Sequence, residues 1–180
     1  METRQVLLNQ TKNEKVNWSY FNALTDITAI YSHKLGYNNA LAGGYMVRFR
    51  EGEIGHRSIQ QFTIVHRLEG YRLSHRFSTD QTWMPNDPIA LRIRYRLASE
   101  IPLQGASLDP KEFYIKASTE YLSQLQDNIV EHEVRLIPVL GYDFTDNNKL
   151  EAGLDYRRSS LFTESLRARY WLKIAWFRTF

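Results

Sequence analysis

The sequence predicts an all-β protein: an antiparallel, up-and-down transmembrane β-barrel of about ten strands, formed by a single domain over residues 1–180. Three observations lead to this prediction. Apolar and polar residues alternate with a period of two in many segments, and several segments are longer than the strands usual in soluble sheets. Stretches typical of turns separate the segments. No apolar run approaches the roughly 18 residues that a membrane-spanning helix requires.

The C-terminal stretch, residues 163–180, shows the alternation clearly. Seven apolar residues share one parity, and the charged residues Arg167, Arg169 and Lys173 share the other. The seven are Leu166, Ala168, Tyr170, Leu172, Ile174, Trp176 and Phe180. A strand of this kind, long and ending on an aromatic residue, is typical of the closing strand of an outer-membrane barrel. Its apolar face would contact lipid and its charged face would line the lumen.

The rest of the chain supplies the other strands in order. The expected strands before the closing one are residues 3–10, 18–35, 41–50, 61–69, 71–83, 89–100, 113–121, 134–144 and 150–157. Connections are expected at residues 13–15, 36–39, 51–56, 69–70, 84–88, 102–110, 124–133, 145–148 and 159–164. With both termini on the periplasmic side, the periplasmic turns would be short except for 102–110.

The polar parity places many charged residues in the expected lumen. The predicted lumen charge network comprises Arg48, Arg50, Arg72, Arg76, Arg92, Arg94, Arg96, Glu100, Glu120, Asp143, Asp155, Arg167 and Arg169. Two interpretations stay open. Ion pairs would fill a narrow barrel, which is the favoured interpretation, or guanidinium groups left without a carboxylate would bind a small anion. Basic residues outnumber acidic residues in this set, so an anion-binding site remains a possible interpretation.

The apolar parity supplies the expected lipid-facing surface, with aromatic rings for the interfacial girdles. The predicted membrane-facing and girdle residues are Trp83, Leu91, Tyr95, Tyr142, Tyr170, Trp176 and Phe180.

Several short segments resemble a known family in their order along the chain. They are the run from Gly43 to Arg48, the run from Ile59 to Phe62 leading to Leu73–Phe77, the strand Arg92–Leu97 ahead of Pro102-Leu103, and the pair Gly141-Tyr142. Together they resemble the domain-of-unknown-function 2490 family of small outer-membrane β-barrel proteins from Gram-negative bacteria, over roughly residues 40–180. The resemblance implies a location and a shape, and it transfers no catalytic residues.

Composition excludes some classes of function. The chain has no cysteine, and therefore no disulfide or thiolate site, and its 23 basic residues are spread along its length, so nucleic acid is not an expected partner. The N-terminus lacks the apolar core of a secretory signal. The expected location is still the cell outer membrane, with this sequence as a mature form that carries a new initiator methionine.

Two groups of residues are candidates for a catalytic or a metal site. His66 and His75 flank a turn near Ser74 and Glu69, but their parity points to the lipid side, away from those partners. Residues 131–133, Glu-His-Glu, are expected in a solvated loop, without a second cluster to complete a metal shell. The sequence therefore predicts no catalytic residue, no metal and no cofactor.

The expected function is that of a non-catalytic barrel with a structural, accessory or narrow, porin-like transport role. Its partners would be outer-membrane lipid, other outer-membrane proteins or a small anionic ligand. Two alternatives remain. One is an outer-membrane enzyme acting on lipid or peptide at the barrel rim. The other is a soluble calycin-like barrel of inverted parity, with Leu91, Tyr95 and Phe113 around an apolar ligand.

Overall fold

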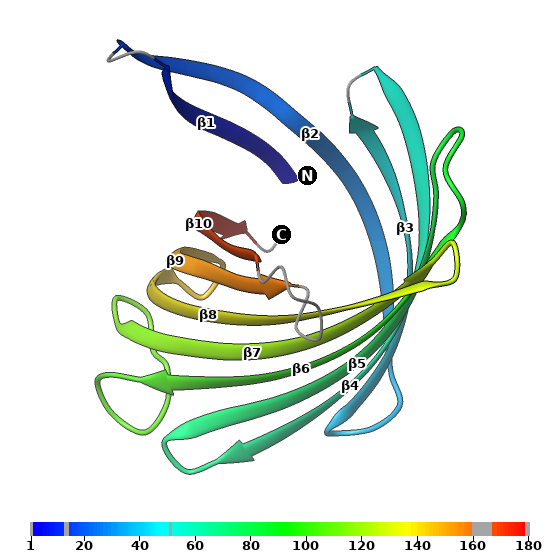
Figure 1. Ribbon diagram of the computed structural model, residues 1–180. Coiled ribbons are helices and arrows are strands. Elements are labelled where there is room, and N and C mark those ends of the chain that lie inside the picture. The colour runs from blue at the N-terminus through cyan, green and yellow to red at the C-terminus, as the bar shows by residue number, and fades with distance from the viewer. Residues whose placement is uncertain (1, 13–14, 51, 160–166, 179–180) are drawn as a thin grey trace.

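The computed structural model describes residues 2–12, 15–50, 52–159 and 167–178, and these residues contain strands and connections but no helix that could cross a membrane. The strands are β1 (Glu2–Lys12), β2 (Lys15–Lys34), β3 (Asn39–Arg50), β4 (Glu53–Leu68), β5 (Tyr71–Trp83), β6 (Ala90–Pro102), β7 (Phe113–Gln126), β8 (Ile129–Thr145), β9 (Asn148–Ser159) and β10 (Arg167–Arg178). Each strand pairs antiparallel with its neighbours in the chain, so that one sheet runs in sequence order (Figure 1). The predicted all-β, up-and-down architecture is confirmed.

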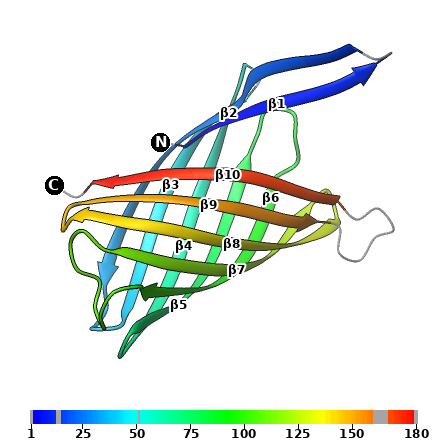
Figure 2. The same ribbon diagram turned by 90° about the vertical axis from the view of Figure 1, so that its left-hand side faces the viewer.

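The sheet curls strongly but stays open on one side. β1 and β10 are its two edges, and no pairing joins them within the described residues. The first part of β2, together with β1, extends away from the remaining strands, whereas Thr25–Lys34 of β2 pair with β3 and β10 lies alongside β9 (Figure 2). The described chain is therefore an open, barrel-like trough.

The prediction of a polar connection at residues 124–133 is wrong. β7 and β8 continue through it and meet at Asp127 and Asn128, whose φ angles of 50° and 59° are those of a tight type I′ hairpin turn. The stretch looks like a loop because both faces carry polar residues near this end of the sheet. Likewise, the expected loop at residues 51–56 is shorter, because β4 begins at Glu53 after Gly52, which has a φ of 86°.

Among the described residues, the connections expected at 36–39, 69–70, 84–88, 102–110 and 145–148 lie between strands as the sequence places them, including the turn Glu69-Gly70 and the long link over residues 103–112. The connections expected at 13–15 and 159–164 lie largely outside the described residues. The long link is fastened to the neighbouring strand end: the Lys111 amide donates to the Asp143 carbonyl at 2.6 Å, and the Asp143 amide donates to the Glu112 carbonyl at 3.0 Å. Because this long link shares its end of the sheet with the short turns, loop length does not distinguish the two ends of the sheet.

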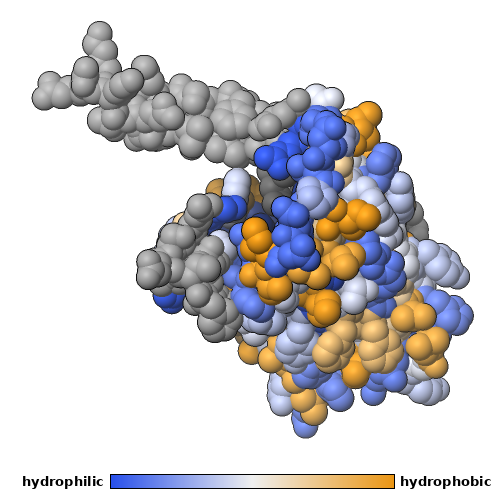
Figure 3. Space-filling model, turned by 45° about the vertical axis from the view of Figure 1, so that its right-hand side comes forward, coloured by the Kyte–Doolittle hydropathy of each residue, from blue (hydrophilic) through white to orange (hydrophobic). Residues whose placement is uncertain are grey.

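The two faces of the sheet have opposite chemistry. Asp26, Asp80 and Glu120 are 1–4% exposed on the concave, inner face, whereas Leu172, Ile174 and Trp176 are 70–79% exposed on the convex, outer face. Figure 3 shows hydrophobic side chains reaching the outer surface in groups with hydrophilic ones between them. The sheet thus buries charge and exposes apolar side chains, the reverse of a soluble domain.

Candidate functional site

The inner face of the sheet carries rows of charged side chains that the strand register sets side by side. One row, called the arginine row here, consists of consecutive register partners on β5 to β10: Arg76, Arg96, Glu120, Arg135, Arg157 and Arg169. Directly opposite residues of an antiparallel pair hold their Cβ atoms about 5 Å apart. The row therefore concentrates five guanidinium groups around a single carboxylate, and charge balance must come from the rows beside it.

Asp80 on β5 is a carboxylate of the inner face that three arginines share. It is 2% exposed, and its oxygens lie 2.5 Å from Nη2 of Arg92, 2.8 Å from Nη2 of Arg94 and 3.5 Å from Nε of Arg57. Arg57 also donates to the Thr82 hydroxyl at 2.8 Å. One buried carboxylate thus ties three strands together, and removing it would leave three buried cations short of a partner.

Asp26 and Arg48 form a second buried pair between β2 and β3. Asp26 is 1% exposed and accepts two hydrogen bonds from the guanidinium, from Nε at 2.7 Å and from Nη2 at 2.6 Å. Two parallel bonds to one carboxylate fix the geometry as well as the charge. This pair belongs to the scaffold of the inner face rather than to a binding site.

Glu120 compensates part of the arginine row. Its Oε1 lies 3.1 Å from Nη1 of Arg135 and 3.9 Å from Nη1 of Arg94. Arg135 also pairs with Glu133, at 2.5 Å. The negative charge of Glu120 is therefore committed mainly to the β8 side of the row.

A further network lies toward the other end of the sheet. The Tyr114 hydroxyl donates to Oε1 of Glu151 at 3.0 Å, bridging β7 and β9 across the intervening strand, and Lys116 pairs with the same carboxylate oxygen. Lys116 Nζ also lies 5.9 Å from the centre of the Phe177 ring on β10. These contacts span the concave side of the sheet and hold its curvature.

Arg76 and Arg96 differ from the other enclosed arginines. Eight arginines of the described residues are buried or half-buried, and six of them lie within 4.0 Å of a carboxylate oxygen: Arg48, Arg57, Arg92, Arg94, Arg135 and Arg157. Arg96 instead donates from Nη2 to the Ser118 hydroxyl at 3.0 Å. The Nε atoms of Arg76, Arg94 and Arg96 are buried without a hydrogen-bond partner, but Arg94 reaches Asp80 through Nη2.

The remaining residues of the predicted lumen network lie nearer the rims or edges. Arg72 is half exposed and pairs with Glu100 at 2.9 Å, while Asp143 is buried and pairs with Lys149 at 2.8 Å. Arg50, at the end of β3, and Arg169, on the edge strand β10, are exposed. The side chain of Arg167 lies outside the described residues.

The inner-face residues that sequence reasoning missed include Arg57 and Glu133. Both fall in stretches beside or within an expected connection, so no parity was assigned to them. Extending the alternation back from Gln61 through Ile59 would have placed Arg57 inward, as the structure does. Extending it back from Arg135 would have done the same for Glu133.

Most of the predicted membrane-facing residues can be placed. Trp83, Leu91, Tyr170 and Trp176 are 39–70% exposed on the outer face. Tyr95 and Tyr142 are half-buried, on the same strand parity as their exposed neighbours. Phe180 lies outside the described residues.

The histidines lie on the outer face, several of them beside tyrosines. Nδ1 of His75 is 2.9 Å from the Tyr95 hydroxyl, and the rings of His66 and His75 meet edge to face, 5.5 Å apart. Ser74 occupies the opposite face. Within the described residues, His66 and His75 form no hydrogen bond or ion pair with a serine, a threonine or a carboxylate.

The Glu-His-Glu motif lies in β8, so its expected placement in a loop is wrong. Glu131 and Glu133 have the inward parity, while His132 has the outward parity. Nδ1 of His132 lies 2.7 Å from the Tyr121 hydroxyl. In the part of the chain that the structure describes, no three potential metal ligands of this kind come together. The strand pleat separates the histidine from its two acidic neighbours.

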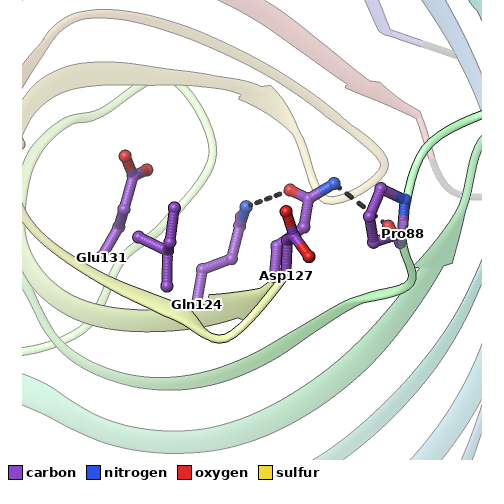
Figure 4. Close-up of a pocket in the computed structure, with 6 residues that line it drawn as sticks. Pro88, Gln124, Asp127 and Glu131 are labelled. Atoms are coloured by element: carbon purple, nitrogen blue, oxygen red, sulfur yellow. Dashed lines mark hydrogen bonds between the residues drawn. The ribbon is translucent and has the colours of Figure 1, made fainter.

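A shallow hollow of about 240 Å³ lies at the end of the sheet near the β7–β8 turn (Figure 4). Gln124 donates to Gln126 at 3.0 Å, and Gln126 donates to the Pro88 carbonyl at 3.1 Å, so these groups satisfy one another. Glu131 stands apart from this chain of bonds in Figure 4. The hollow is an open rim feature and lacks converging charged groups.

The fold and this inner face define an antiparallel β-barrel-like protein with a polar interior and an apolar exterior. The chain belongs to the family described as "Protein of unknown function (DUF2490)", whose model matches residues 10–167. The suspected family is confirmed, and its pattern starts earlier than the expected residue 40, within the first hairpin. Neither a curated protein nor a solved structure matches the chain.

Proposed function

We propose that the protein is an integral outer-membrane β-barrel with a charge-filled interior and a structural, accessory or narrow-transport role. The observation that carries this proposal is the inverted distribution of side chains: Asp26, Asp80 and Glu151 are buried, while Leu172, Ile174 and Trp176 are largely exposed. Lipid around the outer face would cover those apolar side chains, as in transmembrane barrels.

The same proposal requires that the barrel close between β1 and β10. In the hydrocarbon core an unpaired backbone group costs several kcal/mol, so open sheet edges are not tolerated there. β1 and β10 do not pair with each other in the described chain, and pairing them would provide hydrogen-bond partners for the backbone groups of both edges. Closure gives a barrel of ten strands, an even number as in bacterial single-chain barrels.

The ion-pair density favours a narrow or plugged interior. Asp80, Glu120 and Glu151 each engage at least two basic or hydroxyl groups from other strands of the sheet, and their partners project from the inner wall. A barrel of this size has little interior space beyond its side chains. A wide aqueous pore is therefore the less favoured form of transport.

The soluble calycin-like alternative needs Leu91 and Phe113 inside the sheet. Both are on the convex face, 45% and 43% exposed, while their neighbours Arg92 and Tyr114 face inward. The enzyme alternative needs a nucleophile or acid-base pair at a rim, and no observation favours it. The membrane barrel accounts for both faces of the sheet.

Heat modifiability in detergent gels tests the proposal directly. Unboiled protein should migrate differently from boiled protein, and it should precipitate when detergent is removed. A monodisperse protein in plain buffer, without a migration difference, would reject the membrane barrel.

Closure has its own test, because the chain lacks cysteine. A cysteine at Leu172 is combined with a second one at each position from Gln5 to Asn9 in turn. Closure predicts a disulfide at a small set of positions in the membrane-inserted protein, because Cα atoms must lie within about 7 Å. Crosslinking at none of the positions, or equally at all of them, contradicts a defined seam.

A further inference from the structure

We propose that Arg76 and Arg96, together with the Ser118 hydroxyl, form a binding site for a phosphate group on the inner wall of the sheet. The two arginines are direct register partners on β5 and β6, and Ser118 on β7 accepts a hydrogen bond from Arg96. The proposal goes beyond membrane insertion and names the chemistry of a ligand.

The first argument is the contrast with the other arginines. The six remaining enclosed arginines in the described part of the chain each reach a carboxylate, and Asp80 alone serves three of them. Simple filling of the interior by ion pairs predicts the same for Arg76 and Arg96. Instead, these two neighbours have no carboxylate within 4.0 Å among the described residues. Their buried Nε atoms also lack a hydrogen-bond partner, as does Nε of Arg94, which nevertheless reaches Asp80 through Nη2.

The second argument is the energetic cost of this arrangement. Like charges directly opposite in an antiparallel pair repel, and a buried donor without an acceptor costs about 1–3 kcal/mol. Guanidinium groups present planar forks of donors that match the oxygens of a phosphate bidentately. A single phosphate between Arg76 and Arg96 would therefore relieve the repulsion and accept from both unpartnered Nε groups.

The surroundings favour an anion over a neutral ligand. Arg135, Arg157 and Arg169 continue the arginine row, and its one carboxylate, Glu120, lies closest to Arg135. Ser78, on the inner face of β5 two residues from Arg76, is buried and adds a hydroxyl donor to the same wall. The site uses β5, β6 and β7 alone, so it does not depend on closure between β1 and β10.

The test is calorimetric titration of the full-length protein with inorganic phosphate at constant ionic strength, in detergent or in buffer, whichever keeps it monodisperse. Wild-type protein should bind saturably. Arg76→Gln and Arg96→Gln should each weaken binding about tenfold or more, since each removes charge-assisted hydrogen bonds. The matched control is Arg72→Gln, which removes a half-exposed arginine of the same strand and face that is paired with Glu100. It should change the affinity less than about twofold.

Two further variants keep the test decisive if a glutamine variant fails to fold. Arg76→Lys retains the charge but loses the planar fork, so it should bind more weakly than wild type. Glu120→Gln removes the one negative charge of the row and should bind phosphate more tightly. Absence of saturable binding of both inorganic phosphate and the short-chain phosphate lipid described next, or an equal loss in Arg72→Gln, would overturn the site.

A second ligand identifies where the phosphate comes from. Dioctanoyl phosphatidic acid is titrated in parallel, with the same variants. Binding of inorganic phosphate assigns the site to a water-borne anion, and binding of the short-chain lipid alone, lost in Arg76→Gln, assigns it to a lipid headgroup. Binding of neither ligand overturns the proposal. Because heat modifiability is measured separately, failure of the membrane barrel and failure of this site are distinguishable.

Discussion

The ring of Tyr114 on β7 lies directly over Gly141, its register partner on β8, and occupies the space where a Cβ of residue 141 would stand. Tyr114 is 1% exposed and reaches across this glycine to Glu151 on the next strand. Glycine on the inner face of a curved sheet admits such a ring and is a known device for building curvature. The Gly141-Tyr142 pair of the family pattern thus has a packing explanation.

Gly141→Ala should destabilise the protein by about 1–3 kcal/mol, because the new methyl group displaces the Tyr114 ring. The measurement is urea unfolding of the folded protein in detergent or lipid. Gly43→Ala is the control, since a Cβ there meets nothing within 4 Å. Equal midpoints for the two variants would contradict the packing explanation.

Leu91→Arg and Leu172→Arg should sharply reduce the membrane-inserted yield. Both positions are exposed on the outer face, and an arginine facing lipid near the midplane costs about 2–4 kcal/mol. Fractionation of membranes with quantified heat-modifiable protein measures the effect. Leu91→Phe, which keeps the surface apolar, should insert normally; normal insertion of both arginine variants would argue against a lipid-facing surface.

Asp80→Asn should cost about 3–5 kcal/mol of stability, because three arginines from the two neighbouring strands, β4 and β6, lose their shared carboxylate. Thermal or urea unfolding reports the loss. Asp87→Asn removes an exposed loop carboxylate and should leave the midpoint unchanged. A similar small change in both variants would mean that the Asp80 cluster contributes little.

Asn128→Val should weaken the β7–β8 hairpin by about 1–2 kcal/mol, since a β-branched residue at a φ of 59° is strained, whereas Asn128→Gly should be tolerated. Hydrogen exchange of the strand ends beside the turn is the local readout. The control is Asn147→Val in the β8–β9 turn. Residue 147 does not have a positive φ, so this substitution should destabilise its turn less than Asn128→Val does. Equal protection in the valine and glycine variants of residue 128 would contradict the assigned turn.

Much of the fold was predictable because period-two alternation is a local signal. It assigned Asp80 and Arg94 inward and Leu91 and Leu172 outward without knowledge of any partner. The signal failed at residues 124–133. In this stretch, both faces of the strands carry polar side chains, so the pattern of apolar and polar residues does not show which face a residue occupies. There the decisive feature is the backbone of Asp127 and Asn128, which composition alone does not separate from a longer loop.

The candidate site was less predictable, because it depends on which charges become partners. The sequence indicates a surplus of arginines over carboxylates but not where it falls. Only the register shows that Asp80 takes Arg57, Arg92 and Arg94, leaving Arg76 beside Arg96. Arg57 contributes to that outcome, and it was missed because the start of β4 was placed too late.

The strict neighbour-to-neighbour order of the sheet has a consequence for assembly. Every observed pairing joins strands that are consecutive in the chain, so each forms by closing a short loop at small entropic cost. A seam between β1 and β10 would be the exception, with nearly the whole chain between its partners. Non-local contacts of this kind form slowly. Folding should therefore proceed by successive hairpins, with closure as the late, rate-limiting step, and until that step both edges stay available for mispairing.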